Sequence, residues 1–89
     1  MRPPKNPIHP GEILLEEFLK PAGESQAAFA ARIRWTRARL NEFIRGKRGV
    51  TADAALDLAE ALGTSSKIWM NLQATWDLDA AVRRRRSAA

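Results

Sequence analysis

The 89-residue sequence contains no cysteine and only one histidine, His9. It therefore has no thiol for a disulfide or a thiolate metal site, and the common multi-histidine metal clusters are excluded. No apolar run approaches the ~20 residues that a membrane-spanning helix needs. The first ten residues also lack the apolar centre of a signal peptide. We therefore expect a cytoplasmic protein with no metal or other cofactor and no membrane partner.

The residue sets on which enzymes depend are missing as well. The sequence shows no nucleophile paired with a base, no evident pair of catalytic carboxylates and no glycine-rich phosphate loop. No strand pattern or internal repeat is present either. We therefore expect an all-α binding protein rather than an enzyme.

The length allows one small domain, which buries only about 60–65% of the surface of its unfolded chain. Oligomerisation is a reasonable way to add buried area. The pattern of caps and apolar residues predicts five helices, joined by short connections, within residues 9–82. Pro21 is expected to end the first helix, because a residue before proline disfavours helical angles. We expect residues 1–8 and residues 83–89 to be flexible segments, the second of them basic.

The net charge of +5 is unevenly distributed along the chain. Residues 32–48 hold seven basic side chains against Glu42 alone, whereas residues 11–31 and 49–79 are both net acidic. The positive charge thus lies on one predicted helix and the loop after it. Such a concentration is typical of a surface that binds a polyanion. The alternative is a solvated basic face that has no partner.

Residues 26–45, QAAFAARIRWTRARLNEFIR, predict two short helices joined by a tight turn. Ser25 and Thr36 are placed to cap them, and Thr51 is placed to cap the helix that follows. The small Ala30 suits a close helix crossing, and apolar residues surround it on both sides of the turn: Ile33, Trp35, Leu40 and Phe43. This pattern is that of a helix-turn-helix, whose second helix is free to enter a DNA major groove.

Four segments of the chain resemble the HigA family of antitoxins, which belongs to the lambda-repressor-like, or XRE-type, helix-turn-helix group. They are HPGEIL at 9–14, the helix-turn-helix at 26–45, GKRGVTADAALDLAEALGTS at 46–65 and IWMNLQATWDL at 68–78. The resemblance implies a five-helix, lambda-repressor-like fold. It also implies a homodimeric repressor of its own type II toxin–antitoxin operon, with operator DNA and a HigB/RelE-like mRNA interferase toxin as partners.

The outward positions of the predicted recognition helix are candidates for contacts with base edges: Arg37, Ala38 and Asn41. Glu42 either accepts a hydrogen bond from cytosine or pairs with Arg45. The other basic residues of this region suit the phosphate backbone: Arg39, Arg45, Lys47 and Arg48. By resemblance to XRE-type domains, Gln26 and Thr36 also contact phosphates, at the N-termini of the two helices.

An apolar stripe near the C-terminus has three possible roles. Trp69, Leu72 and Trp76 belong either to the core, to a dimer interface or to a toxin contact, and we assign them to a dimer interface. Arg83–Arg86 is either a solvated run or an additional contact to nucleic acid.

Two residues in the turn depart from the family pattern. Arg34 stands where glycine is usual, and a non-glycine residue at positive φ costs about 1 kcal/mol, so we expect strain or an altered turn. Trp35 replaces a small aliphatic residue, and either fills more of the core or projects its edge toward the DNA backbone. Two alternative functions follow from the sequence: a stand-alone XRE-type regulator without a toxin, and an antitoxin that no longer binds DNA.

Overall fold

The computed structural model describes residues 8–88 and contains only helices within them, as the sequence predicts. Of the expected flexible segments, residues 1–7 and residue 89 lie outside the described residues. The helical elements are α1 (Pro10–Ile13), the π-helical η1 (Leu14–Leu19), α2 (Lys20–Ala22), α3 (Gln26–Ile33), α4 (Arg37–Ile44), α5 (Ala52–Leu62) and α6 (Ser66–Ala88). The first three follow one another without a break and act as one helix. The predicted all-α fold of five helices is therefore confirmed.

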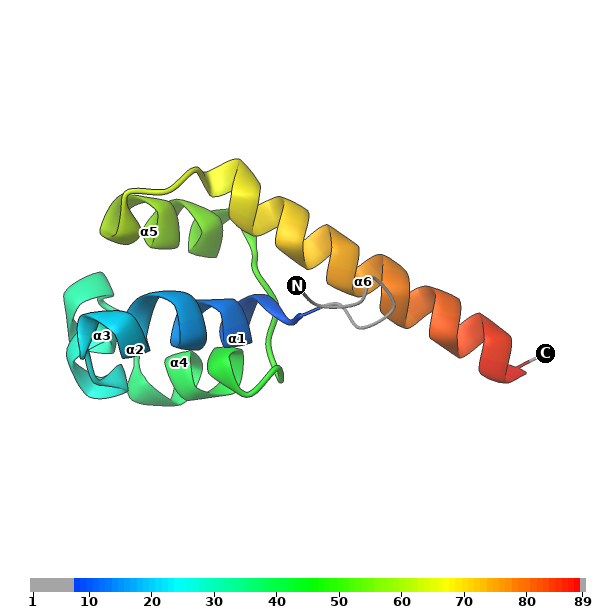
Figure 1. Cartoon of the computed structure of the whole chain (residues 1–89), viewed down its shortest axis with the longest axis horizontal. Coiled ribbons are helices and arrows are strands. Elements are labelled where there is room, and N and C mark those ends of the chain that lie inside the picture. Colours follow the sequence, from blue (N-terminus) through cyan, green and yellow to red (C-terminus); the bar gives the residue numbers. More distant parts are fainter. Residues whose placement is uncertain (1–7, 89) are drawn as a thin grey trace.

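The shorter helices lie together at one side of the molecule, and α6 extends away from them (Figure 1). The first helix lies beside α4, while α5 and the beginning of α6 cover the other side of the core. No helix within residues 8–88 combines the length and the apolar character that crossing a membrane requires.

His9 caps the first helix from a buried position. Its Nδ1 atom accepts a hydrogen bond from the backbone N–H of Gly11 at 2.9 Å. The ring is 8% exposed and makes edge contacts with Phe43 and Trp76, at centroid distances of 5.8 and 5.1 Å. Burial lowers the pKa of His9, which favours the neutral ring that the cap requires. His9 is therefore a buried cap of the first helix and not a surface residue.

The prediction that Pro21 ends the first helix is wrong. The helix continues past Pro21 and ends at Gly23, which is left-handed at φ 66°. The preceding residues, Leu14–Leu19, are π-helical, and the N–H of Lys20 donates to the carbonyl of Leu15. A proline ring collides with the carbonyl four residues earlier in a regular α-helix, and the wider π-type turn relieves this collision.

The predicted caps of the later helices are confirmed. In α3, α4 and α5 the cap hydroxyl accepts from the backbone N–H three residues on, at 3.0–3.2 Å: Ser25 from Ala28, Thr36 from Arg39 and Thr51 from Ala54. Gly46 and Gly63 take positive φ after α4 and α5. These bonds join residues that are close in the sequence, so the helix boundaries follow from the local sequence.

Trp69 belongs to the core of the single chain, so its assignment to a dimer interface is wrong. Its side chain is 1% exposed, and its Nε1 donates to the Thr64 hydroxyl at 2.8 Å. A side chain already buried in this way has no surface left for a second subunit. Leu72 and Trp76 are only partly buried, and their place in a dimer interface stays a prediction.

The C-terminal residues 83–88 are helical, and the flexibility predicted for residues 83–89 stays a prediction. α6 runs without interruption to Ala88, and Arg83 forms an ion pair with Asp79 at 2.8 Å, one turn earlier. No glycine or proline follows Gly63 in the sequence, and alanine and arginine both favour a helix. Nothing in this segment therefore ends the helix.

Gly11 allows the first helix to approach the backbone at the end of α4. A Cβ atom at this position would lie 2.6 Å from the carbonyl carbon of Phe43 and 2.8 Å from the Cα of Ile44. Because these neighbours are backbone atoms, they cannot turn away as a flexible side chain would. We therefore expect Gly11→Ala to lower the free energy of unfolding by at least about 2 kcal/mol in urea titrations.

Gly23→Ala is the matched control for this experiment. Gly23 has positive φ, and a Cβ atom added there would meet no other atom within 4 Å. Only the backbone strain of about 1 kcal/mol is therefore expected. A Gly11→Ala protein as stable as Gly23→Ala would contradict the close packing described here.

Candidate nucleic-acid interface

The rotation of α4 is set by the residues that it buries. Leu40 and Phe43 are both 0% exposed and pack in the core. Because an α-helix turns 100° per residue, the side opposite this pair faces solvent. Arg37, Ala38 and Asn41 are exposed on it. The structure thus places the predicted base-contacting side chains outward, and the contacts themselves remain a prediction.

Gln26 and Asn41 meet where the beginning of α3 lies next to the exposed side of α4. The Nδ2 group of Asn41 donates to Oε1 of Gln26 over 3.4 Å, which is long for a hydrogen bond. This contact orients the Gln26 amide and leaves its NH2 group available to donate. Gln26 is also the first residue of α3, where backbone N–H groups are unpaired. Both features suit an anion such as a phosphate.

Glu42 pairs with Arg48, not with Arg45 as one of our interpretations held. One carboxylate oxygen of Glu42 accepts from Nη2 of Arg48 at 2.8 Å and from its Nε at 3.2 Å. The pair joins α4 to the loop that follows it. It also neutralises the single acidic charge of the recognition helix, which would otherwise repel a phosphate.

The turn before α4 keeps left-handed geometry despite the absence of glycine. Arg34 has φ 61° and ψ 34°, so the expected strained position is present and the turn is not altered. Trp35 is 6% exposed, which confirms that it fills the core. Its Nε1 donates to Oδ2 of Asp57 at 2.9 Å, and the guanidinium of Arg39 lies 3.9 Å above its ring.

The basic residues of this region divide into two groups. Arg45 and Lys47 are exposed after the end of α4, where we predicted phosphate contacts. Arg32 instead bonds other parts of the chain: it donates to both oxygens of Glu24, at 2.9 and 3.0 Å, and to the carbonyl of Ala61 at 2.9 Å. The hydrogen bonds from Arg32 lower the pKa of Glu24. Arg32 therefore adds less to a polyanion-binding surface than its charge suggests.

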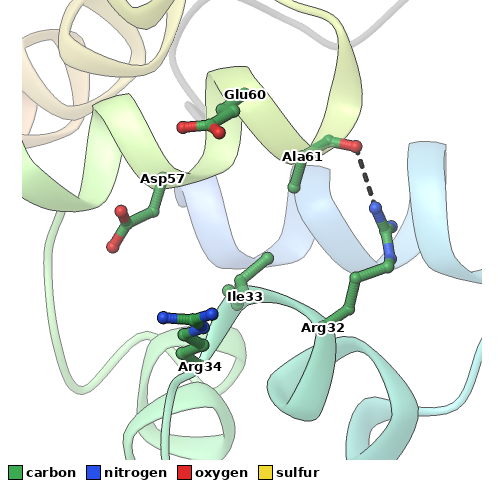
Figure 2. A pocket seen from close by; sticks show the side chains of 6 residues that line it. All are labelled: Arg32, Ile33, Arg34, Asp57, Glu60 and Ala61. Atoms are coloured by element: carbon green, nitrogen blue, oxygen red, sulfur yellow. Dashed lines mark hydrogen bonds between the residues drawn. The ribbon is translucent and has the colours of Figure 1, made fainter.

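A cleft of about 600 Å³ marks the border of the basic surface, between the turn after α3 and α5 (Figure 2). Arg32, Ile33 and Arg34 line one side of it, and Asp57, Glu60 and Ala61 line the other. The carboxylates on the α5 side would repel a nucleic-acid backbone. The surface that suits phosphate therefore ends at the turn.

The sequence did not indicate the hydrogen-bond partners of Trp35 and Arg32. Asp57 and Glu24 were counted only as acidic residues, and no motif indicated that they bond Trp35 and Arg32. The partners lie 22 and 8 residues away along the chain. No local spacing rule covers such separations.

The chain is similar to known proteins in both its sequence and its fold. A family model described as "Helix-turn-helix" matches residues 15–69. Virulence-associated protein I of Dichelobacter nodosus is 45% identical over 80 residues, which are 90% of this chain and 74% of the relative. Antitoxin HigA-1 of Vibrio cholerae serotype O1 is 39% identical over 75 residues, 83% of this chain and 70% of the relative.

A solved structure resembles almost the whole chain. The antitoxin HigA of Pseudomonas aeruginosa, determined with the higBA promoter, is 38% identical with a TM-score of 0.88. The alignment covers 93% of this chain and 90% of that protein.

Glu42 serves either to hold Arg48 or to contact a base, and these two interpretations predict different effects of its removal on DNA binding. If Glu42 serves mainly to hold Arg48, Glu42→Ala removes one negative charge from the exposed side of α4. We then expect binding to a duplex from upstream of the gene and to an unrelated duplex to strengthen equally, by up to about fivefold, in fluorescence anisotropy titrations.

The control is Glu60→Ala, which removes an exposed carboxylate from α5 instead of α4. It is expected to change both affinities less than Glu42→Ala does. A Glu42→Ala protein that loses its preference for the upstream duplex would show that Glu42 reads a base.

Proposed function

Because the chain belongs to the HigA-type family of helix-turn-helix antitoxins, we propose that it is a sequence-specific DNA-binding antitoxin that represses its own operon. In this proposal it also neutralises a HigB/RelE-like toxin, is no enzyme and acts in the cytoplasm, where its DNA target lies. The observation that carries the proposal is the exposed side of α4. It presents Arg37 and Asn41 while its other side is locked in the core.

Binding to DNA divides between base edges and phosphates. Arg37 has the donors for two hydrogen bonds to guanine, and Asn41 has the groups for two to adenine. Gln26, Thr36, Arg45 and Lys47 surround them with groups that suit phosphate. The promoter complex of the related HigA protein supports this use of the fold.

A homodimer would read a two-fold symmetric operator with half-sites about one helical turn apart, or a multiple of that. The projecting part of α6 supports such a dimer. Leu78 and Val82, one turn apart on α6, are 68% and 38% exposed. Exposed apolar side chains at this spacing form a stripe that a second helix can cover. Leu78 and Val82 thus offer exposed apolar surface for a dimer contact, which the buried Trp69 cannot offer.

The alternative of an antitoxin that no longer binds DNA loses its support. It depended on Arg34 and Trp35 disturbing the turn. Arg34 takes the left-handed conformation, and Trp35 is accommodated in the core. The other alternative, a stand-alone regulator, shares all the DNA-binding geometry and differs only in having no toxin partner.

Substitution of single basic residues tests the DNA-binding part of the proposal. We expect Arg37→Ala to reduce the preference for the operator by about 1–3 kcal/mol at its contacted base, because a two-bond contact to guanine is lost. Arg45→Ala should instead weaken all duplexes alike and reduce the slope of log affinity against log salt by about 1. Anisotropy titrations at several salt concentrations measure both. An unchanged operator preference in Arg37→Ala would show that α4 docks in a different register.

Co-expression with the adjacent small reading frame tests the toxin-neutralising part. We expect the two proteins to co-purify and the chain to relieve the growth arrest caused by its neighbour. Arg37→Ala serves as the control, because it should lose operator preference and still relieve the arrest. A neighbour that is neither toxic nor bound would favour the stand-alone regulator.

A further inference from the structure

Trp35 connects two parts of the molecule that lie far apart in the sequence. The edge of the indole is bonded to Asp57 of α5 through Nε1, at 2.9 Å. One face of the indole carries the guanidinium of Arg39, at 3.9 Å from the ring centroid. The ring also meets Phe43 of the core edge-on, with an interplanar angle of 78°. The position of Trp35 is therefore defined on several sides, and with it the position of the Arg39 guanidinium.

The contact with the indole leaves donors of Arg39 available. A guanidinium carries five N–H donors, and one that lies over an aromatic ring does not use all of them there. Arg39 is only partly buried, so part of the residue is open to solvent. Its backbone N–H bonds the Thr36 hydroxyl, which holds Arg39 in the first turn of α4. The N-terminus of that helix is also the part of α4 expected to approach a phosphate.

We propose that Trp35 is a positioning residue for DNA binding, which holds the guanidinium of Arg39 in the orientation that meets the DNA backbone beside the first turn of α4. Asp57 in turn fixes the indole. The inference depends on the proposed function, because it assumes that α4 docks on DNA. A small aliphatic residue at position 35 would offer no flat face, and Arg39 would lose its orientation on binding.

The competing explanation is purely structural. In that case Arg39 only shields the indole from water, and its charge lies too far from the duplex to matter. The two explanations differ in whether the effects of Trp35 and Arg39 on DNA affinity depend on each other, since a structural role for Trp35 would act without Arg39.

The test measures affinities for a labelled duplex from upstream of the gene and for an unrelated duplex of equal length. Arg39→Lys keeps the charge but has no planar group, and we expect it to bind both duplexes about three- to tenfold more weakly. Trp35→Leu should weaken binding by a similar factor. The double variant should be no weaker than Trp35→Leu alone, because Arg39 has no platform there. Trp35→Phe keeps a flat face but loses the bond to Asp57, so it should bind more tightly than Trp35→Leu and more weakly than the original protein.

A second pair of variants isolates the role of Asp57. Asp57→Asn and Asp57→Ala remove the same charge, but only asparagine keeps an acceptor for Nε1 of Trp35. We expect Asp57→Asn to bind DNA more tightly than Asp57→Ala. Melting temperatures of all variants show whether each protein is folded at the temperature of the titration.

The inference is overturned if Arg39→Lys binds both duplexes as tightly as the original protein, or if the effects of Trp35→Leu and Arg39→Lys multiply in the double variant. Should Trp35→Leu fail to fold, Trp35→Phe takes its place in the double variant with Arg39→Lys, and effects that multiply there overturn the inference. An original protein that shows no preference for the upstream duplex contradicts the proposed function. The comparison of the two duplexes with the original protein is independent of the affinity differences among the variants.

Discussion

The burial of Leu40 and Phe43 is the constraint on which the proposed activity depends. These two side chains hold one side of α4 in the core and thereby set the rotation of the helix about its axis. A helix that presented Arg37 to the core would bury an unpaired charge, which is destabilising, whereas burying a leucine is stabilising. The same packing that stabilises this small domain therefore also aims its recognition side chains at solvent.

The contacts around α4 fix where the helix begins and how it lies in the domain. The Thr36 cap fixes where the helix begins, and the close approach at Gly11 fixes how the first helix lies against its end. Asp57 and Trp35 tie the preceding turn to α5. The position and the direction of the helix are thus determined by contacts at both of its ends. Such rigidity before binding reduces the entropy lost when the side chains dock.

Ion pairing decides which charges remain available to a partner. Arg32 is committed to Glu24 and to a carbonyl of α5, and Arg48 is shared with Glu42. Arg45 and Lys47 stay exposed, so the basic surface is narrower than the charge count of residues 32–48 indicates. The carboxylates of Asp57 and Glu60 close it on the side of the cleft. A distribution of this kind orients a polyanion as well as attracting it.

Sequence alone determined the helical class, the caps at Ser25, Thr36 and Thr51, and the outward side of α4. These features depend on spacings of three or four residues, which a helix converts directly into contacts. Tertiary structure decided that Trp69 is core, that Trp35 bonds Asp57, and that Arg32 reaches Ala61 across 29 residues. It also decided the course of the first helix past Pro21, through a π-helical segment that no propensity indicates. Contacts between distant residues depend on how whole helices pack, and no local pattern encodes that arrangement.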